Sequence, residues 1–289
     1  MSKPWIFISP ASRGIGHALA RHLLQRTRTP IVGTARQDLA GVKASILQDL
    51  EPHGLNASHH DYERRLHVLQ LDVTNEGSIA AATKATEELF PGMTHHLHLG
   101  FALPGVLRPE RSPAAIEYVD ALHTLRVNLL GPLMLMKHFG EFLPRRVGEL
   151  DLRSVGAEEG DGGDSSETPL LSLPEHATFV AAAARVGSTS DNRLGGWYSY
   201  RASKAGVISV ARTYDIHLRA RSGGRAIALA YHPGTVRTGL SREFWNHVPP
   251  DQLFSPDRAA RYLADLVCRR LGPGHRGRCW DWKGEEVLP

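Results

Sequence analysis

The sequence has little cysteine and no long apolar stretch. Its 289 residues include only two cysteines, Cys268 and Cys279, which cannot form a multi-disulfide scaffold and lack the spacing of a zinc site. The longest nearly uncharged stretches, Leu97–Leu107 and Val127–Met136, fall well short of the roughly 20 residues that a bilayer span requires. No signal or transit peptide is visible before the apolar run Trp5–Ile8. We therefore expect a cytoplasmic protein that does not enter a membrane.

The sequence also lacks any run of five or more basic residues, although it is basic overall. Lys and Arg number 34 against 30 Asp and Glu, a net charge of +4, and 28 of these 34 residues are arginines. It does not show the interleaved aromatic and basic residues of an RNA-binding sheet. Arginine suits the two-pronged recognition of phosphate better than lysine does. The composition therefore favours a small molecule that carries phosphate, and not nucleic acid, as the partner.

Length and composition fit one globular domain. With 42% apolar and 22% charged residues, the chain is neither disordered nor fibrous in composition. The exception is the stretch 148–174, which is rich in Gly, Ser, Asp and Glu; within it Glu149–Glu167 holds seven acidic residues and one basic residue. We expect a single domain over residues 1–289 with a mobile acidic surface insertion at about 148–174.

Short apolar segments alternate with segments of helical period, which is typical of a parallel sheet covered by helices. The pattern predicts strands at residues 5–9, 31–34, 66–71, 97–103, 177–183, 225–231 and 278–282. It predicts helices at residues 15–24, 39–50, 75–89, 114–142, 201–220 and 256–270, with Asn75 as a cap and a break near Gly131-Pro132. The predicted fold class is therefore α/β, with a doubly wound, mostly parallel sheet of seven strands and helices on both faces.

The first predicted strand leads through a glycine-containing turn, Ser9-Pro-Ala-Ser-Arg-Gly-Ile-Gly16, into a helix. Such a turn offers free backbone N–H groups and the positive end of a helix dipole, which together hold a pyrophosphate. The spacing is not G-x-G-x-x-G. Taken alone, the turn therefore leaves cofactor binding and a plain connection equally open.

A second motif, Tyr200-Arg-Ala-Ser-Lys204, lies at the start of the helix after the fifth predicted strand. Tyr and Lys four residues apart share a helix face. A nearby ammonium favours the phenolate and lowers a pKa that is ordinarily about 10. Tyr200 is therefore a candidate proton donor and acceptor, and Lys204 is the group that would adjust it.

With these motifs the sequence resembles the short-chain dehydrogenase/reductase family, over essentially the whole chain outside the acidic insertion. Five motifs in the family's order carry the likeness: Ser9–Gly16, Asp72-Val73, Val127-Asn-Leu-Leu-Gly131, Tyr200-x-x-x-Lys204 and Pro233-Gly-Thr-Val-Arg-Thr238. Three further segments resemble its C-factor-like branch more narrowly: Arg185–Ser188, Asp191–Lys204 and Trp280–Trp282.

The resemblance implies a Rossmann-type fold that transfers hydride between a nicotinamide and a carbonyl or alcohol. Tyr200 would protonate the carbonyl oxygen, Lys204 would lower the Tyr pKa and bind the nicotinamide ribose, and Asn128 would hold a water linked to Lys204. A homodimer or homotetramer built through the long helices is also implied. The candidate cofactor contacts are Ser9, Ser12, Arg13, Gly14, Ile15, Gly16, Arg36, Asp72, Val73, Gly105, Tyr200, Lys204, Pro233, Gly234, Val236 and Thr238.

The end of the second predicted strand indicates which nicotinamide cofactor is used. A preference for NAD usually needs a carboxylate there, which accepts hydrogen bonds from the ribose 2′-OH. This strand ends Gly33-Thr-Ala-Arg36, with no acidic residue before Asp38. Arg36, together with Arg13, is suited to pair with a 2′-phosphate. We therefore expect NADP(H).

The sequence departs from the family pattern at three places. Pro10 stands where the family has the first loop glycine, and proline has no N–H to offer. Ala102–Gly105 replaces an Asn-Asn-Ala-Gly segment. The position of the catalytic serine falls on Ala183 or Ala184, and losing such a hydrogen bond typically costs about 10²–10³ in rate. Ser188 is the candidate substitute, and otherwise we expect catalysis to be impaired, relocated or absent.

Two functions therefore stay open. The first is an NADP(H)-dependent oxidoreductase that acts on a small-molecule carbonyl or alcohol through Tyr200, Lys204 and Asn128. The second is a catalytically weak or silent family member that binds nucleotide or a partner protein, with residues 148–174 as its interaction segment. The Tyr, Lys and Asn favour the first, because such a triad needs joint geometry, and the missing serine favours the second.

Histidines outside these motifs raise the possibility of a metal site. His96 and His98 share one face of a predicted strand, while His95 points away. No third ligand has a fixed position beside them. We therefore expect surface histidines and no metal.

Aromatic residues near the motifs allow two interpretations. Trp197, Tyr198 and Trp245 either line a substrate pocket or pack in the core. The segment Phe244–Val248 lies where the family has a mobile substrate lid, and its apolar residues favour a hydrophobic substrate. Asp281 is expected to be an exposed residue at a strand edge.

Overall fold

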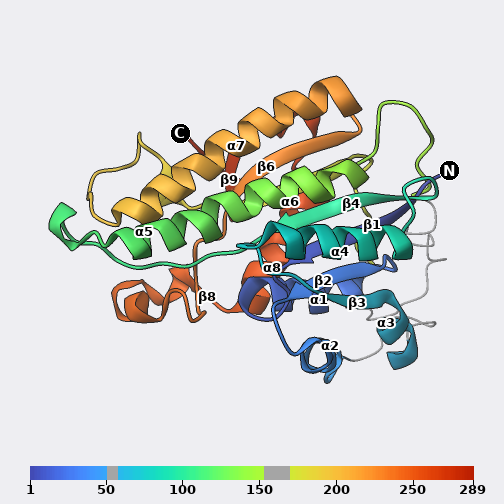
Figure 1. The fold of residues 1–289 in the computed structure, drawn as a ribbon, viewed down its shortest axis with the longest axis horizontal. Coiled ribbons are helices and arrows are strands. Elements are labelled where there is room, and N and C mark those ends of the chain that lie inside the picture. Colours follow the sequence, from blue (N-terminus) through green and yellow to red (C-terminus); the bar gives the residue numbers. More distant parts are fainter. Residues whose placement is uncertain (51–57, 153–169) are drawn as a thin grey trace.

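The centre of the molecule is a sheet of eight strands in the order β10-β9-β6-β5-β4-β1-β2-β3, seen in a computed structural model that describes residues 1–50, 58–152 and 170–289 (Figure 1). The strands are β1 (Lys3–Ser9), β2 (Ile31–Ala35), β3 (Leu66–Gln70), β4 (His95–Ala102), β5 (Ala177–Ala182), β6 (Ala226–His232), β9 (Cys279–Asp281) and β10 (Glu286–Val287). The predicted α/β class is confirmed. Eight strands replace the predicted seven because β10 folds back and pairs antiparallel with β9, while every other pair in this sheet is parallel.

Helices cover both faces of the sheet (Figure 1). They are α1 (Gly14–Arg26), α2 (Leu39–Leu47), α3 (His59–Arg65), α4 (Glu76–Leu89), α5 (Tyr118–Leu125), α6 (Gly131–Phe139), α7 (Tyr198–Ser222) and α8 (Pro256–Asp265). Ile6 and Ile8 of β1 belong to an apolar cluster with α1, α2, α3 and α8. Trp5 and Phe7 belong to a second cluster with α4, α6 and α7. Because side chains alternate along a strand, one cluster lies on each face.

Helices α3 and α4 each begin at a polar residue whose side chain caps the helix N-terminus. Asn75 caps α4 as predicted, since its side chain accepts a hydrogen bond from the N–H of Ser78 at 3.2 Å. Helix α3 was not predicted; Ser58 caps it by accepting from the N–H of Asp61. Within the three described ranges, no helix is both long and apolar enough to cross a membrane.

The helix predicted over 114–142 begins later than expected and does not break at Gly131-Pro132. It consists of α5, a π-helical turn (Arg126–Leu130) and α6. The N–H of Gly131 bonds to the carbonyl of Arg126, five residues back. This wider turn leaves room for the ring of Pro132, which in a regular α-helix clashes with the carbonyl four residues before it. The turn also contains Asn128.

The strand order reverses at β1, which lies between β2 and β4. Ile8 of β1 pairs with Gly33 of β2 on one side and with Phe101 of β4 on the other. The connections that leave β1 and β4 therefore diverge to opposite faces. In open α/β sheets such a reversal opens a crevice at the carboxyl ends of the strands, where ligands bind.

The predicted acidic insertion at about 148–174 lies mostly outside the described residues, at 153–169. Both of its described ends are attached to the body of the domain, one beside the start of β1 and one at the end of α1. On one side Ser2 forms an isolated parallel bridge with Leu150. On the other side Leu171 is buried and its N–H bonds to the carbonyl of Arg26 at 2.6 Å.

Candidate active site

The glycine loop joins β1 to α1 with backbone geometry that requires its glycines. Gly14 has a φ of +59°, which disfavours other residues. A Cβ on Gly16 would lie 1.9 Å from the carbonyl oxygen of Pro10, so no larger residue fits. The peptide bond between Ser9 and Pro10 is cis. The two family glycines that remain are thus both used by the turn.

The N-terminus of α1 carries no negative charge of its own. Arg13 occupies the cap position in an extended conformation, its side chain forms no capping hydrogen bond, and the first turn contains no acidic residue. The backbone N–H groups at such an end have no partner within the helix, and the helix dipole makes the end positive. This end is therefore suited to receive an anion.

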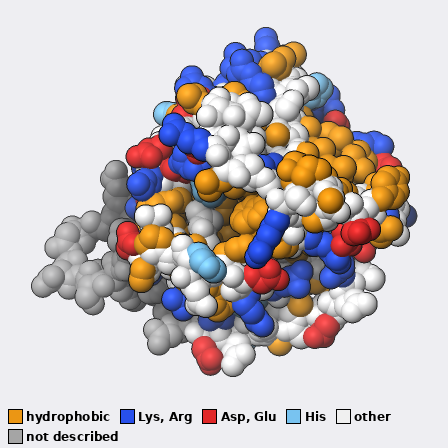
Figure 2. Space-filling view, turned by 90° about the vertical axis from the view of Figure 1, so that its left-hand side faces the viewer, with side chains coloured by type: hydrophobic (Ala, Val, Ile, Leu, Met, Phe, Trp, Pro, Cys, Tyr) orange, Lys and Arg blue, Asp and Glu red, His pale blue; other side chains and the backbone are white. Residues whose placement is uncertain are grey.

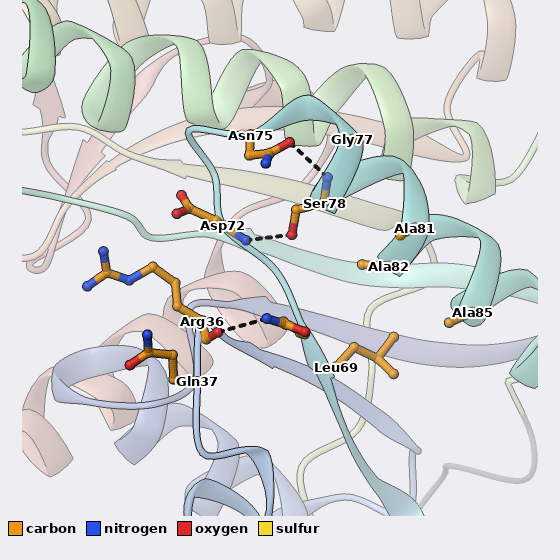
Figure 3. A pocket seen from close by; sticks show the side chains of 11 residues that line it. Arg36, Gln37, Leu69, Asp72, Asn75, Gly77, Ser78, Ala81, Ala82 and Ala85 are labelled. Atoms are coloured by element: carbon orange, nitrogen blue, oxygen red, sulfur yellow. Dashed lines mark hydrogen bonds between the residues drawn. The ribbon is translucent and has the colours of Figure 1, made fainter.

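Arg36 and Asp72 lie together at the ends of β2 and β3. Both line a cavity of about 910 Å³, and Figure 3 shows their side chains pointing toward the same side of it. Partial burial acts to raise the pKa of Asp72, but hydrogen bonds from the N–H and hydroxyl of Thr74 and the charges of Arg36 and Arg126 together lower it. The guanidinium of Arg36 is exposed. A carboxylate and a guanidinium thus border the cavity at the carboxyl edge of the sheet.

Tyr200 and Lys204 lie in the first turns of α7, and both are buried. The Lys204 Nζ lies 5.7 Å from the centre of the Tyr200 ring and donates a hydrogen bond to the carbonyl of Ala182, the last residue of β5, at 2.6 Å. Burial lowers the pKa of Lys204 to about 8 and raises the pKa of Tyr200 to about 12. In this structure burial therefore raises the pKa of Tyr200, in the direction opposite to the expected fall.

Asn128 is fully buried in the π-helical turn and is joined to α7. Its Oδ1 accepts from the N–H of Val106 at 2.8 Å, and its Nδ2 donates to the carbonyl of Val106 at 2.9 Å and to the hydroxyl of Ser203 at 3.1 Å. The hydroxyl of Ser203 in turn donates to the carbonyl of Tyr200 at 2.7 Å. The structure thus brings the three predicted residues Asn128, Tyr200 and Lys204 into one region. Sequence reasoning missed Ser203, although it stands inside the Tyr-x-x-x-Lys motif.

Two alanines follow β5 where the family has its serine. Ala183 and Ala184 are buried and offer no side-chain donor. Ser188 lies four residues further on, and its hydroxyl accepts from the N–H of Asp191 at 3.1 Å. No hydrogen bond between Ser188 and Tyr200 occurs among the described residues. Whether Ser188 substitutes for the serine therefore stays a prediction.

The segment Pro233–Thr238 lies beside the glycine loop. It follows β6, and its Thr235–Val236 forms strand β7, which pairs with β8 (Leu253–Phe254). Gly234 has a φ of +73°, and a Cβ there would lie 2.8 Å from the ring of Phe254. The methyl group of Thr238 lies 3.3 Å from the position of a Cβ on Gly14. The first and last predicted motifs are thus neighbours in space.

The remaining predicted cofactor residues also gather at this edge. Ser9 ends β1, and its buried hydroxyl accepts from the hydroxyl of Thr34 at 2.8 Å. Val73 lies against Gly131, and Gly105 lies against Leu240. Ser12 lies in the glycine loop and Ile15 lies in the first turn of α1. All of them follow the carboxyl ends of strands in the sheet.

An aromatic side chain, Trp197, lies against Tyr200 and links it to Phe244. The Trp197 ring lies 6.1 Å from the Tyr200 ring and 4.8 Å from the Phe244 ring, measured between centres. Phe244 belongs to the 3₁₀ helix η6 (Arg242–His247). Trp197 and Trp245 are partly exposed and belong to neither apolar cluster. Trp197 thus lies beside Tyr200, whereas Trp245 donates a hydrogen bond to the hydroxyl of Ser241 at 2.9 Å and its ring centre lies 5.7 Å from the guanidinium of Arg237. That these residues line a substrate pocket stays a prediction.

The surface around this region is rich in apolar side chains. Figure 2 looks onto the side that holds the start of α5, where hydrophobic side chains gather among Lys and Arg. The large exposed apolar residues of these segments are Ile116, Tyr118, Val119, Leu122, Leu194 and Tyr198. The hydrophobic substrate that the sequence favours stays a prediction.

Two predictions about residues outside the motifs are wrong. Asp281 is 2% exposed and accepts hydrogen bonds from Arg185 at 2.7 Å and from the N–H groups of Lys283 and Glu285. It is buried because the chain folds back into β10. His96 and His98 share a strand face as predicted but are buried, since the described ends of the insertion cover this part of β4.

The buried histidines form a chain of hydrogen bonds. The Nε2 of His96 bonds to the Nδ1 of His98 at 3.1 Å, His96 also bonds to the hydroxyl of Ser2, and His98 bonds to the carbonyl of Pro174. Burial lowers the pKa of His96 to about 4 and that of His98 to about 3. Among the residues that the structure describes, no group of three or more His, Cys, Asp or Glu is arranged to hold a metal ion.

Sequence reasoning also missed Glu110. It lies between β4 and α5 and is 5% exposed. Its carboxylate accepts from the N–H and hydroxyl of Ser199, next to Tyr200. No sequence signal marks it, because its partners lie 89 residues away.

The chain is similar to known proteins in sequence and in fold. No protein-family model matches the chain. The chain is 38% identical over 250 residues to 1-hydroxy-2-glutathionyl-2-methyl-3-butene dehydrogenase of Rhodococcus sp. (strain AD45), covering 86% of this chain and 85% of that protein. It is 29% identical over 172 residues to C-signal of Myxococcus xanthus, covering 60% of this chain and 80% of that protein. Among solved structures, an NADPH-bound carbonyl reductase from chicken fatty liver has a TM-score of 0.74 at 22% identity over 100% of both chains, which shows the same fold.

Proposed function

The chain belongs to the short-chain dehydrogenase/reductase family, and from this premise we propose that it is an NADP(H)-dependent oxidoreductase that interconverts a small-molecule carbonyl compound and its alcohol. One observation carries the proposal. Buried Tyr200 and Lys204 lie at the carboxyl edge of the sheet, and Thr238, from the motif that follows β6, lies beside Gly14 of the glycine loop. A proton donor and a dinucleotide loop at one edge are the two parts that carbonyl reduction requires.

The residues present fit a dinucleotide that carries a 2′-phosphate. Gly16 leaves no space for a larger side chain, the positive φ of Gly14 disfavours one, and the N-terminus of α1 lacks a cap of its own. Arg13 and Arg36 are exposed, and among the described residues none accepts a hydrogen bond from either guanidinium. Arg13 and Arg36 would hold the 2′-phosphate, and the α1 end would hold the pyrophosphate. When bound, NADPH supplies the hydride.

Tyr200 supplies the proton in this proposal. Because burial raises its pKa to about 12, the phenol stays protonated at neutral pH. As the carbonyl carbon is reduced, the proton passes from the Tyr200 Oη to the substrate oxygen, which becomes the hydroxyl of the alcohol; oxidation of the alcohol reverses the transfer. Lys204 is charged below about pH 8 and stabilises the phenolate that remains.

The alanines after β5 support a second candidate function. With Ala183 and Ala184 in the serine position, the substrate oxygen receives one hydrogen bond fewer, a loss that typically costs about 10²–10³ in rate. The second candidate is a catalytically weak or silent member that binds the nucleotide or a partner protein. Both candidates share the cofactor site and differ only in turnover.

The test measures NADPH oxidation with a panel of hydrophobic carbonyl compounds, in the wild type and in Tyr200→Phe. We expect the variant to lose about 10²–10⁴ in kcat, because it cannot donate the proton, while its affinity for NADPH falls far less, because the glycine loop and the arginines are intact. Tyr214→Phe is the matched control, since Tyr214 lies further along the same helix and its hydroxyl has no hydrogen-bond partner among the described residues. Activity that survives Tyr200→Phe unchanged refutes the mechanism, and tight NADPH binding without turnover of any compound favours the second candidate.

A further inference from the structure

A buried carboxylate from a distant segment closes the N-terminus of the helix that carries Tyr200. Glu110 lies in the connection from β4 to α5, 89 residues before Ser199. Its Oε2 accepts from the N–H of Ser199 at 2.7 Å, and its Oε1 accepts from the Ser199 hydroxyl. Its backbone carbonyl accepts from the N–H of Trp197 at 2.6 Å. We call these contacts between Glu110, Trp197 and Ser199 the Glu110 clamp.

The clamp holds a backbone conformation that the local sequence disfavours. Trp197, the cap residue of α7, has a φ of +54° and forms no side-chain capping bond. Gly195 and Gly196 before it also have positive φ. A large residue in this left-handed region costs free energy, and it persists only where surrounding contacts fix it. The bond from the N–H of Trp197 to the carbonyl of Glu110 is such a contact.

The same connection is attached to the site at a second point. Val106, four residues before Glu110, exchanges two backbone hydrogen bonds with the Asn128 side chain. Asn128 leads through the hydroxyl of Ser203 to the carbonyl of Tyr200. The connection therefore reaches Tyr200 twice, once through the N–H groups before it and once through its own carbonyl. A shift of this connection would shift the tyrosine.

The position of Tyr200 in the helix makes it sensitive to this contact. Tyr200 is the third residue of α7, immediately after Ser199. N–H groups in a first helical turn have no partner within the helix, so an external acceptor decides how that turn sits. A carboxylate is also stabilised by the helix dipole at this end. The clamp thus fixes the helical turn from which the Tyr200 side chain projects.

We propose that Glu110 is a positioning residue for Tyr200: its carboxylate holds the first turn of α7 so that the phenol stays in the geometry for proton transfer. The inference rests on the proposed reductase function. Such a positioning role differs from ordinary helix capping in the measured quantity that it changes. A cap changes the free energy of unfolding, whereas a positioning residue also changes kcat in the folded enzyme, because small displacements of a reacting group are costly.

The experiment compares Glu110→Ala and Glu110→Gln with the wild type at a temperature at which circular dichroism shows every variant fully folded. Glu110→Ala removes both side-chain bonds, and we expect kcat to fall about 100-fold, because misplacement of a reacting group by about 1 Å costs that much. Glu110→Gln keeps the shape and one acceptor, and we expect a fall of about tenfold. The KM for the carbonyl compound and the Kd for NADPH should stay within about twofold, because the cofactor loop is untouched.

Two further variants calibrate the result. Ser199→Ala removes the hydroxyl and keeps the N–H, so it should lower kcat by less than Glu110→Ala does. Glu117→Gln is the matched control, because Glu117 is exposed in the same connection and forms no capping bond. An unchanged kcat in folded Glu110→Gln and Glu110→Ala overturns the proposal. If Glu110→Ala does not fold, Glu110→Gln alone carries the test.

Hydrogen–deuterium exchange separates failure of this inference from failure of the reductase function. In Glu110→Ala, amides of residues 195–204 should exchange faster than in the wild type, while those of β4 (His95–Ala102) should not change. If the wild type reduces no carbonyl compound, the proposed function fails, and faster exchange in 195–204 still supports the clamp. Unchanged exchange in 195–204 overturns the clamp whatever the activity.

Discussion

The N-termini of helices α1 and α7 differ in what lies against them. Helix α1 begins at Gly14 without a side-chain cap or an acidic residue in its first turn, and Arg13 and Arg36 are exposed nearby. Helix α7 also lacks a cap of its own, but a buried carboxylate from Glu110 bonds to its first turn. At both ends the first N–H groups have no partner within the helix, and the helix dipole makes both ends positive.

This difference shows that a helix N-terminus can either bind a ligand or hold a side chain of the site in place. At α1 the end stays accessible and has arginines beside it, so it suits an anionic ligand that comes and goes. At α7 the end is filled permanently from within the chain, so the helix is fixed and its third residue, Tyr200, is held in place. The first two predictions below concern the cofactor site at α1, the third concerns α7, and the last uses the ordinary cap of α8 as a reference.

The largest effect is expected when the α1 end receives a negative charge. Arg13→Glu places a carboxylate at the cap position, where it competes with the pyrophosphate and repels it. We expect NADPH affinity to fall about 100-fold, since a hydrogen bond to a charged group is worth about 1.5–3 kcal/mol and repulsion adds to its loss. Fluorescence titration of NADPH measures the change, with exposed Arg28→Glu as control. Equal affinity in both variants would mean that α1 does not bind the cofactor.

A smaller effect is expected at the neighbouring arginine. Arg36→Ala should weaken NADPH binding about 20-fold, within the range for losing a hydrogen bond to a charged group, and should leave NADH binding unchanged. The reason is that only NADPH carries the 2′-phosphate. Titration of both cofactors checks the prediction. Tighter binding of NADH than of NADPH by the wild type would contradict the assignment of NADP(H).

The turnover that depends on α7 should change with pH, whereas the cofactor binding that depends on α1 should not. Burial lowers the pKa of Lys204 from 10.5 to about 8, so its charge is present below pH 8 and is lost as the pH rises through that value. We expect kcat for carbonyl reduction to fall about tenfold between pH 7 and pH 9, as the fraction of charged Lys204 falls. The Kd for NADPH should change little, because arginines stay charged. A kcat that is flat over this range would remove Lys204 from the proposed mechanism.

The smallest effect is expected at a third helix end, which has an ordinary cap. Ser255 caps α8 by accepting from the N–H of Arg258 at 3.1 Å. Ser255→Ala should lower the free energy of unfolding by about 1 kcal/mol and leave kcat and KM unchanged. Urea denaturation measures the first value and steady-state kinetics the second. A loss of kcat as large as that of Glu110→Gln would remove the distinction between capping and positioning.

Much of the fold follows from local patterns in the sequence. The apolar segments predicted every strand of the central sheet except β10, and Asn75 predicted the start of α4. Helix α3 was missed because its sequence, His59–Arg65, has little apolar content and its stability comes from packing. Strand β10 was missed because two residues are too short for an alternation pattern.

Some residues of the candidate site could be predicted from the sequence and others could not. Residues inside motifs, such as Tyr200, Lys204 and Asn128, were predicted and lie together at one edge of the sheet. Glu110 and Asp281 were missed or misjudged, because their partners are distant in sequence and nothing local marks them as buried. His96 and His98 were misjudged for the same reason: alternation predicts a shared face, not what covers it.

The sequence by itself determined most of the strands and helices along the chain and the motifs at the strand ends, and it supplied the basic residues of the proposed phosphate site. These follow from periodicity and from short-range chemistry, which act between neighbours in the chain. The tertiary structure alone decided the protonation of buried groups and the partner of each helix end. Burial sets the pKa values of Tyr200 and Lys204, and a carboxylate 89 residues away completes α7. Desolvation and contacts between distant segments exist only once the chain has folded.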